Sequence, residues 1–468
     1  MSLLLLERAK RGETSVRPRP DEQYRFHFDM AKCIGCRCCE VACAEQNGNS
    51  LEINWRRVGE IEGGSYPYAQ RFYLSMGCNH CLDPSCLAGC PVNAYSKDSV
   101  TGLVLHSAEA CIGCQYCTWN CPYGVPQYNP ERGVVGKCDM CFGRLVEERA
   151  PACVDACPEG AIQIETVNIA KWRSNFESAN APGMPAADYT ISTTRITLPD
   201  KAAAELERAD YHRVRPEHSH LPLVAMLVLT QLSVGAFAYL AVLKTTRPAP
   251  VLAALLVAFL SLGASTLHLG RPIYAFRALR MWRRSWLSRE VLLFSLFAGA
   301  AAASVFVPGL VLVAALLGAA GITASAFIYL VPARPAWNHK STLWDFYLTA
   351  LLLGPLFLAT AGVPAPRLAI GVAAAVQLLN QLLRFMRMAA SDEFELRASA
   401  RLLANDLRGL FLLRLMLLIG GGVILPLTGQ FVPGFGFSLA AELLSRYLFF
   451  VSVVPKNMAA SFFQREAA

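Results

Sequence analysis

The second half of the chain is a series of apolar runs separated by short polar connections. Each run has about 20 residues, the length that an α-helix needs to cross a bilayer. Buried helices of a water-soluble domain are the alternative, but such helices would not confine their charge to alternate connections. The pattern predicts an all-α bundle of eight transmembrane helices, near residues 221–243, 250–268, 288–306, 309–331, 343–361, 366–386, 408–428 and 434–455.

The first half has a different composition. All 17 cysteines lie before residue 221, and the apolar half has none. Residues 166–220 have no clear hydrophobic period and are rich in Ala, Pro, Thr and charge. At roughly 150 residues per domain, 468 residues allow two to four domains. We therefore expect a cysteine-rich domain over 1–165, a connector over 166–220 and a membrane domain over 221–468.

Charge divides at the same place. Residues 1–220 have 23 Lys+Arg and 27 Asp+Glu, whereas the remainder has 20 and 8. Because the basic half is also the apolar half, its charge is expected at a membrane surface and does not indicate nucleic-acid binding. About fifteen of these basic residues lie in or beside the even-numbered connections and the C-terminus, and only Lys244, Arg247 and Arg367 lie in the odd-numbered connections.

Sixteen of the cysteines form four groups with related spacing. The first group follows C-x2-C-x2-C-x3-C, and the other three groups end in x3-C-P. The groups are Cys33, Cys36, Cys39 and Cys43; Cys78, Cys81, Cys86 and Cys90; Cys111, Cys114, Cys117 and Cys121; and Cys138, Cys141, Cys153 and Cys157.

This spacing is typical of iron–sulfur proteins. C-x2-C-x2-C brings three thiolates to one cluster, and the fourth cysteine reaches the other cluster of a pair. Sixteen thiolates supply four [4Fe–4S] clusters, which leaves Cys38 over. Zinc is the alternative for C-x2-C pairs, but four near-repeats favour iron. The N-terminus shows no secretory signal, so a disulfide scaffold is not expected.

Five segments of this region resemble the iron–sulfur subunit of dimethyl-sulfoxide-reductase-type molybdoenzymes. They are Cys78–Cys81, Cys111–Cys117, Cys121–Gly124, Gln127–Asn129 and Lys137–Cys141. The resemblance covers roughly residues 25–165 and implies an α+β, bis-ferredoxin-like fold. Some relatives lack one cysteine of the third group and hold a three-iron cluster, but this chain keeps Cys117, so four cubanes are implied.

The resemblance also implies how the cysteines pair. In that family the first and fourth groups share two clusters, and so do the second and third. The implied ligand sets are Cys33, Cys36, Cys39 and Cys157; Cys43, Cys138, Cys141 and Cys153; Cys78, Cys81, Cys86 and Cys121; and Cys90, Cys111, Cys114 and Cys117.

The membrane half resembles the anchor subunit of the same reductases. The segments Ser265–Pro272 and Leu287–Glu290, the pair Gly354-Pro355, and Glu442 with Arg446 appear in the matching order. The anchor class typified by polysulfide reductase also has eight helices, but the motif around His268 favours the first class. In the family, the positions matching His268 and Glu290 are implicated in quinol binding.

The chemistry of quinone supports these two candidates. Quinone and quinol exchange protons as well as electrons, and a neutral imidazole or a carboxylate in apolar surroundings can accept a proton. Alternatively, His268 is an interfacial hydrogen bonder and Glu290 an acid at a helix N-terminus. Only His268 lies in or beside a span interior, so a haem with two histidine ligands is not expected.

Other ionisable residues fall within the predicted spans. Asp345, Glu442 and Arg446 are further candidates for the quinone site or for a proton path, because burying such groups in a membrane is costly. Arg414 belongs to the same class, and Gln231 is a weaker candidate. A structural ion pair between Glu442 and Arg446, four residues apart on one helix, is equally compatible with the sequence.

Together these features predict a redox subunit of an oxidoreductase in the bacterial inner membrane. It would pass electrons between a molybdopterin-containing catalytic subunit and the quinone pool, because the chain has no molybdopterin, dinucleotide or hydrolytic motif of its own. The basic connections place the iron–sulfur domain in the cytoplasm, which favours sulfite oxidation with quinone reduction. The alternatives are a sulfur-compound reductase that oxidises menaquinol, a redox-driven proton translocator and a purely structural anchor.

Overall fold

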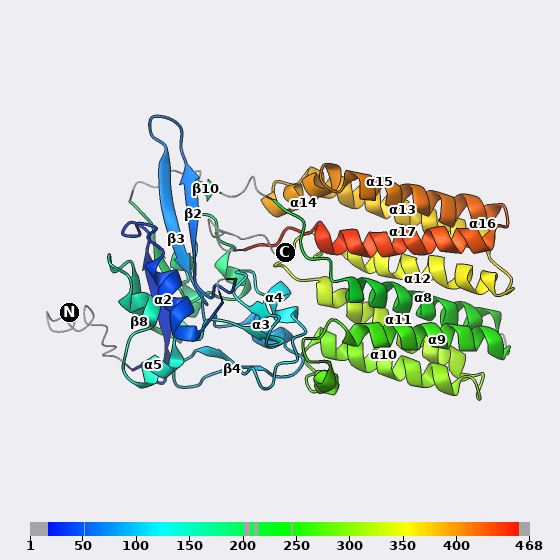
Figure 1. Ribbon diagram of the computed structural model, residues 1–468, viewed down its shortest axis with the longest axis horizontal. Coiled ribbons are helices and arrows are strands. Elements are labelled where there is room, and N and C mark those ends of the chain that lie inside the picture. The colour runs from blue at the N-terminus through cyan, green and yellow to red at the C-terminus, as the bar shows by residue number, and fades with distance from the viewer. Residues whose placement is uncertain (1–16, 51, 201–205, 210–213, 245–246, 458–468) are drawn as a thin grey trace. The chain divides into compact units, whose positions relative to one another are not determined.

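The computed structural model describes residues 17–50, 52–200, 206–209, 214–244 and 247–457 (Figure 1). It divides into two compact units, the first formed by residues 1–213 with 456–468 and the second by residues 214–455. The two units are described separately below.

A three-stranded sheet forms the centre of the first unit. Strand β1 (Glu22–Asp29) pairs antiparallel with β8 (Ile162–Asn168) and parallel with β9 (Arg195–Thr197). Both faces of β1 are buried, which is typical of a central strand. The buried polar side chains are paired, as where Arg25 contacts Glu165 at 2.6 Å.

Three smaller sheets and short helices complete this unit. Strand β2 (Arg57–Gly63) lies between β3 (Gln70–Met76) and β10 (Leu206–Arg208). Strand β4 (Tyr95–Lys97) pairs with β5 (Val104–His106), and β6 (Gln127–Asn129) pairs with β7 (Val134–Gly136). The helices are α2 (Cys38–Asn47), α3 (Ser85–Gly89), α4 (Tyr116–Asn120), α5 (Phe142–Val146), α6 (Ala152–Asp155) and α7 (Ile169–Ser174), with 3₁₀ turns at Glu177–Ala179 and Ala187–Tyr189.

The segment predicted to be a connector contributes to this first unit. It supplies α7, β9 and β10, and β8 continues past residue 165. Thr193 is fully buried, and its hydroxyl donates to the carbonyl of Asn79 at 2.6 Å. The segment therefore packs on the cysteine-rich core.

The second unit contains, within its described residues, eight helices long and apolar enough to cross a membrane (Figure 1). This confirms the predicted eight-helix bundle. Its helices are α8 (Leu221–Leu243), α9 (Pro248–Thr266), α10 (Trp286–Ala303), α11 (Leu310–Tyr329), α12 (Lys340–Thr360), α13 (Arg367–Ala389), α15 (Arg408–Leu418) and α17 (Phe431–Val451), with the seventh span continuing through a π-turn at Ile419–Ile424 into α16 (Leu425–Leu427). Two shorter helical segments, Pro272–Leu279 and α14 (Phe394–Ala404), lie between spans.

The ends of the helices differ slightly from the prediction. Helix α9 ends at Thr266, so His268 lies just beyond the helix and not at its last residue. Helix α10 begins at Trp286, so Glu290 lies one turn inside it. Both residues lie at the same end of the bundle, because His268 follows the C-terminal end of α9 and Glu290 lies near the N-terminal end of the next span, α10.

Helices α8 and α12 approach each other closely at a point where each has a glycine, Gly235 on α8 and Gly354 on α12. A Cβ atom on Gly235 would lie 2.0 Å from the carbonyl oxygen of Ala350, and one on Gly354 would lie 2.2 Å from the carbonyl carbon of Gly235. Membrane helices pack closely through such small residues because lipid supplies no hydrophobic force between them. This contact joins the N-terminal helix of the bundle to its second half.

Candidate functional site

The four cysteine groups share one backbone feature. In each C-x2-C loop, the residue before the second cysteine has a positive φ: 70° at Gly35, 42° at His80, 70° at Gly113 and 60° at Met140. A left-handed residue reverses the backbone direction and lets both flanking thiols point to the same side of the loop. At Gly35 a Cβ would also lie 2.6 Å from the ring of Tyr73, so glycine is required there for two reasons.

Each group has two more cysteines in or just after a short helix. Cys39 and Cys43 both lie on α2, whereas Cys86, Cys117 and Cys153 lie on α3, α4 and α6, and their partners four residues on, Cys90, Cys121 and Cys157, follow the ends of those helices. The two cysteines of a pair are thus about one helical turn apart along the chain. Each pair can therefore reach two adjacent centres.

Two cavities show which thiols meet. One cavity, with about 320 Å³ of space between atoms including the open solvent at its mouth, is lined by Cys33, Cys36, Cys39 and Cys157. The other, with about 350 Å³ on the same basis, is lined by Cys78, Cys81, Cys86 and Cys121. In each cavity, three thiols come from one sequence group and the fourth comes from another group.

The remaining eight thiols are linked by their mutual electrostatic effects. Burial raises the pKa of Cys43, and negative charge on Cys153 and Cys141 raises it further. The pKa of Cys138 is raised in the same way by burial and by Cys43 and Cys153. An equivalent set surrounds Cys117, whose pKa is raised by burial and by Cys114, Cys111 and Cys90.

These thiols are costly to ionise without a cation. Burial raises the pKa of Cys39 to about 11 and that of Cys114 to about 12, so both would be protonated at neutral pH. Thiolate is the form that binds metal, and a metal ion offsets the cost of burying it. No disulfide uses any of the 17 cysteines, all of which lie in the described residues. The donor set therefore fits iron–sulfur clusters.

Among the described residues, no three His, Cys, Asp or Glu side chains meet closely enough to hold one ion. A tetrahedral zinc site needs all its ligands about 2 Å from one atom. A cubane instead places each thiolate on a different iron, so wider spacing around a cavity suits a cluster.

Two buried cations lie between the thiol sets. Burial would lower the pKa of Arg56, but the charges of Cys153, Cys39 and Cys138 raise it above its ordinary value. The Lys137 pKa is raised in the same way by Cys78, Cys86 and Cys138. Lys137 is fixed by donating to the carbonyl of Cys138 at 2.8 Å. These cations offset negative charge at the junctions between neighbouring sets.

Cysteines of different sets also affect one another. Burial raises the pKa of Cys39 and of Cys138, and charge on Cys153 and on Cys78 respectively raises it further. Burial raises the pKa of Tyr95 as well, and charge on Cys117, Cys86 and Cys90 adds to this effect, so Tyr95 lies near cysteines of two sets. Neighbouring sets are therefore within electrostatic range of each other. Cys38, the spare cysteine, is exposed.

In the membrane unit, His268 and Glu290 lie on neighbouring elements. Burial lowers the pKa of His268 to about 4, while a hydrogen bond to the backbone of Ser265 acts in the opposite direction, so the imidazole is neutral at pH 7. Its Nδ1 atom is buried and has no hydrogen-bond partner in the described part of the chain. Glu290 is 7 % exposed on α10 and lies beside Ser325 of α11.

His220 is a neighbour that the sequence did not indicate. It is the N-cap of α8, and burial together with positive charge on His218, His268 and Arg334 lowers its pKa to about 3. The only signal in the sequence was its position next to an apolar run. Because His220 lies within electrostatic range of His268, counting histidines inside spans does not by itself exclude haem.

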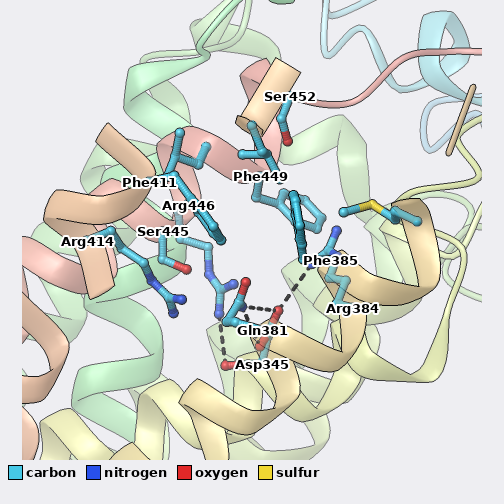
Figure 2. A pocket seen from close by; sticks show the side chains of 13 residues that line it. Asp345, Gln381, Arg384, Phe385, Phe411, Arg414, Ser445, Arg446, Phe449 and Ser452 are labelled. Atoms are coloured by element: carbon cyan, nitrogen blue, oxygen red, sulfur yellow. Dashed lines mark hydrogen bonds and ion pairs between the residues drawn. The ribbon is translucent and has the colours of Figure 1, made fainter. Parts of the chain in front are cut away.

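Asp345 belongs to a separate polar cluster, shown in Figure 2. Both of its carboxylate oxygens accept from Gln381 at 2.9 Å, and Arg384 lies 3.2 Å from Oδ2. Asn380 donates to Oδ1 at 2.7 Å. These partners on α13 could not be recognised from the sequence, since each is an ordinary polar residue in a helix.

Arg446 and Glu442 do not form the direct ion pair that the sequence allowed. In the described residues, Arg446 Nη2 donates to Gln231 Oε1, to the carbonyl of Asp345 and to Thr349 Oγ1, at 3.0 to 3.1 Å. The Thr349 hydroxyl lies 2.6 Å from Glu442 Oε2. Thr349 therefore bridges the two, because the helix rotates Arg446 toward α8 and α12.

Two family models match the chain in sequence order. A 4Fe-4S dicluster domain matches residues 69–167, and a dimethyl sulfoxide reductase anchor subunit matches residues 216–391. Both matches confirm the resemblances seen in the sequence. The second match spans α8 to α13 and includes His268 and Glu290.

Individual relatives match part of the chain. A chain of the anaerobic dimethyl sulfoxide reductase of Haemophilus influenzae is 37% identical over 191 residues, which cover 39% of this chain and 92% of the relative. Its counterpart in the anaerobic dimethyl sulfoxide reductase of Escherichia coli K12 is 38% identical over 176 residues, covering 36% and 85%. A sulfite dehydrogenase subunit of Allochromatium vinosum is 32% identical over 160 residues, covering 30% and 67%. The protein is a member of the family of iron–sulfur subunits that includes these dimethyl sulfoxide reductase chains, here continuous with an anchor domain of the same type of reductase.

Proposed function

We propose that this chain carries electrons between a molybdopterin-containing catalytic subunit and the quinone pool through four [4Fe–4S] clusters. The observation that supports this most strongly is the grouping of the thiols, because two cavities each bring three cysteines of one sequence group together with a fourth from another group. Relatives named as reductase and dehydrogenase subunits support the same electron-transfer role. The eight membrane helices supply the anchor.

The protein's own part in this role is to hold and space the clusters. The proposed ligand sets are those implied by the family resemblance, and the two cavities agree with two of these sets. Clusters bound there would take up and release single electrons. Arg56 and Lys137 would offset the negative charge of neighbouring clusters. Positive charge near a cluster stabilises its reduced form and so raises its reduction potential.

The first prediction concerns the ligands. Replacement of Cys114 by serine should remove or convert one cluster, because its thiol is buried in the last set. We expect close to sixteen irons per chain in the anaerobically purified wild type and an EPR spectrum that loses one cluster signal in Cys114→Ser.

The exposed Cys38 provides the matched control. Cys38→Ser should keep the full iron content and all EPR signals. Zinc in place of iron in the wild type, or loss of a cluster in Cys38→Ser, would contradict the proposed ligand sets.

We place the quinone site at His268 and Glu290. The buried, unpartnered Nδ1 of His268 offers a hydrogen bond to a quinone or quinol oxygen, and the neutral ring can accept a proton. Glu290, covered on the next helix, can relay that proton. Asp345, Glu442 and Arg446 contact one another or shared partners, and we assign them to the separate cluster described above.

The second prediction tests this assignment. His268→Ala should lower quinone turnover by about 100-fold or more, the usual effect of removing a general acid or base. Glu290→Gln should lower it as well, since amides do not relay protons. The assay is steady-state oxidation or reduction of a quinone analogue by the purified complex.

Thr266 is a suitable control. Its hydroxyl bonds only to its own helix, at 2.8 Å from the carbonyl of Gly263. Thr266→Ala should keep normal turnover, and all variants should keep wild-type cluster EPR signals. Normal turnover in His268→Ala would favour a purely structural anchor.

The substrate is proposed to be sulfite, oxidised with reduction of quinone. One relative is a sulfite dehydrogenase subunit, and the basic connections favour a cytoplasmic iron–sulfur domain. The dimethyl sulfoxide reductase relatives are more similar in sequence, at 37 to 38% identity. That observation favours the second candidate, a reductase that oxidises menaquinol.

The third prediction separates these candidates. The purified complex should reduce a quinone analogue when sulfite is added, because electrons would then flow from the catalytic subunit to the membrane. Electron flow from a quinol analogue to dimethyl sulfoxide, without any sulfite-dependent activity, would establish the reductase instead.

The fourth prediction concerns orientation in a bacterial inner membrane. Connections rich in Lys and Arg usually face the cytoplasm. The arginine-rich α9–α10 connection should therefore face the cytoplasm, and the uncharged α10–α11 connection should face the periplasm. Val307 and Arg283, one in each connection, are exposed. In intact cells, a membrane-impermeant maleimide should label Val307→Cys and should not label Arg283→Cys. The reverse pattern would place the iron–sulfur domain in the periplasm.

A further inference from the structure

A cavity in the membrane unit has the features of an anion site. It is a narrow, partly open pocket between α12, α13, α14, α15 and α17, with about 470 Å³ of space between atoms when the open solvent at its mouth is included. Three guanidinium groups line it, from Arg384, Arg414 and Arg446, against the single carboxylate of Asp345 (Figure 2). The lining therefore has an excess of positive charge.

The carboxylate of Asp345 is already fully engaged. Its two oxygens accept from Asn380, Gln381 and Arg384, all on α13. Arg384 is thereby neutralised, and its Nη2 donates to the carbonyl of Ala336 at 2.8 Å. Arg446 donates only to neutral oxygens in the described residues. The carboxylate of Glu442 lies one hydroxyl away from Arg446, through Thr349. Among the described residues, Arg414 is therefore the guanidinium of this pocket whose charge no bonded carboxylate balances.

Arg414 is the decisive residue. Its side chain is only 1% exposed, and none of its three nitrogen atoms has a hydrogen-bond partner in the described part of the chain. A buried guanidinium without acceptors is strongly unfavourable, so its donors should meet an anion when the protein is in its membrane. Guanidinium groups match phosphate oxygens in geometry as well as charge.

The cavity lies near one end of the helix bundle. Asp345 and Arg414 are five and six residues beyond the first residues of α12 and α15, and Arg384 and Arg446 are five residues before the ends of α13 and α17. At 1.5 Å per residue this is about 8 Å from the helix ends. Spans of 20 to 23 residues match a hydrocarbon core of about 30 Å, so the cavity is at the edge of that core, within reach of the adjoining headgroup layer.

The remaining walls are apolar. Phe385 of α13 and Phe411 of α15 stack with their ring centroids 5.8 Å apart, and Phe449 and Leu448 of α17 also line the cavity. Exposed leucines such as Leu382, Leu383 and Leu413 lie on the same helices. An occupant with a phosphate and an acyl chain would satisfy both the arginines and these walls, whereas a neutral quinone would leave Arg414 unpaired.

We propose that this cavity binds the phosphate of an anionic phospholipid, with Arg414 and Arg446 as its principal donors. Basic pockets between membrane helices are known to hold such headgroups on the side that carries basic connections. The site would fasten α15 to α12 and α17, and it is independent of the quinone site proposed at His268 and Glu290.

The test measures lipid retained by the purified full-length protein. After exchange into detergent, lipid extraction and mass spectrometry should find about one anionic phospholipid per wild-type chain. Arg414→Gln should retain at least tenfold less. Arg408→Gln changes an exposed arginine on the same helix and should retain as much as the wild type.

A second measurement does not depend on how the variants fold. Delipidated wild-type protein should unfold at a higher temperature in phosphatidylglycerol nanodiscs than in phosphatidylcholine nanodiscs, and inorganic phosphate should not reproduce this shift. An equal shift with inorganic phosphate would show that free phosphate is the ligand. Absence of anionic phospholipid from the wild type, or equal loss in Arg414→Gln and Arg408→Gln, would overturn the proposal.

Discussion

The structure of the first unit depends on the cost of burying thiolates. Burial raises the pKa of thiols such as Cys39 and Cys114 and keeps them protonated near neutral pH in the absence of a cation. Metal binding removes that cost and contributes its free energy to folding. The left-handed residues at His80 and Met140 are tolerated for the same reason, since strained loops persist only when their surroundings hold them firmly. Folding and cluster loading are therefore expected to be one process.

In the membrane unit, buried charged side chains are stabilised by hydrogen bonds to residues of several helices. Asp345 is surrounded by donors from α13, and Arg446 is joined to α8 and α12 by hydrogen bonds. Close packing at Gly235 and Gly354 brings α8 near enough to α12 for these bonds to form. Each such contact contributes only about 1 kcal/mol, because separated helices also find polar partners, so several contacts together are needed to fix the arrangement of the helices.

Much of this organisation could be predicted from sequence because it depends on local spacing. Four cysteine loops and eight apolar runs are periodic features, and each is recognised from residues within about 25 positions of one another. Partners from distant segments could not be predicted. Nothing in the sequence indicates that Gln381 binds Asp345, that Thr349 bridges Glu442 and Arg446, or that His220 approaches His268. The short strands β9 and β10 were also missed, since three residues show no hydrophobic period.

The two units bury charge of opposite sign. Thiolates and clusters are negative, and the first unit surrounds them with buried cations such as Arg56 and Lys137. The second unit carries excess positive charge near the ends of its helices, where Arg414 is left without an acceptor among the described residues. A protein can satisfy the first imbalance with its own cofactors, because their ligands are covalently part of the chain. Among its described residues the second unit offers Arg414 no acceptor, so the proposed phospholipid phosphate would supply from outside the chain what the cofactors supply in the first unit.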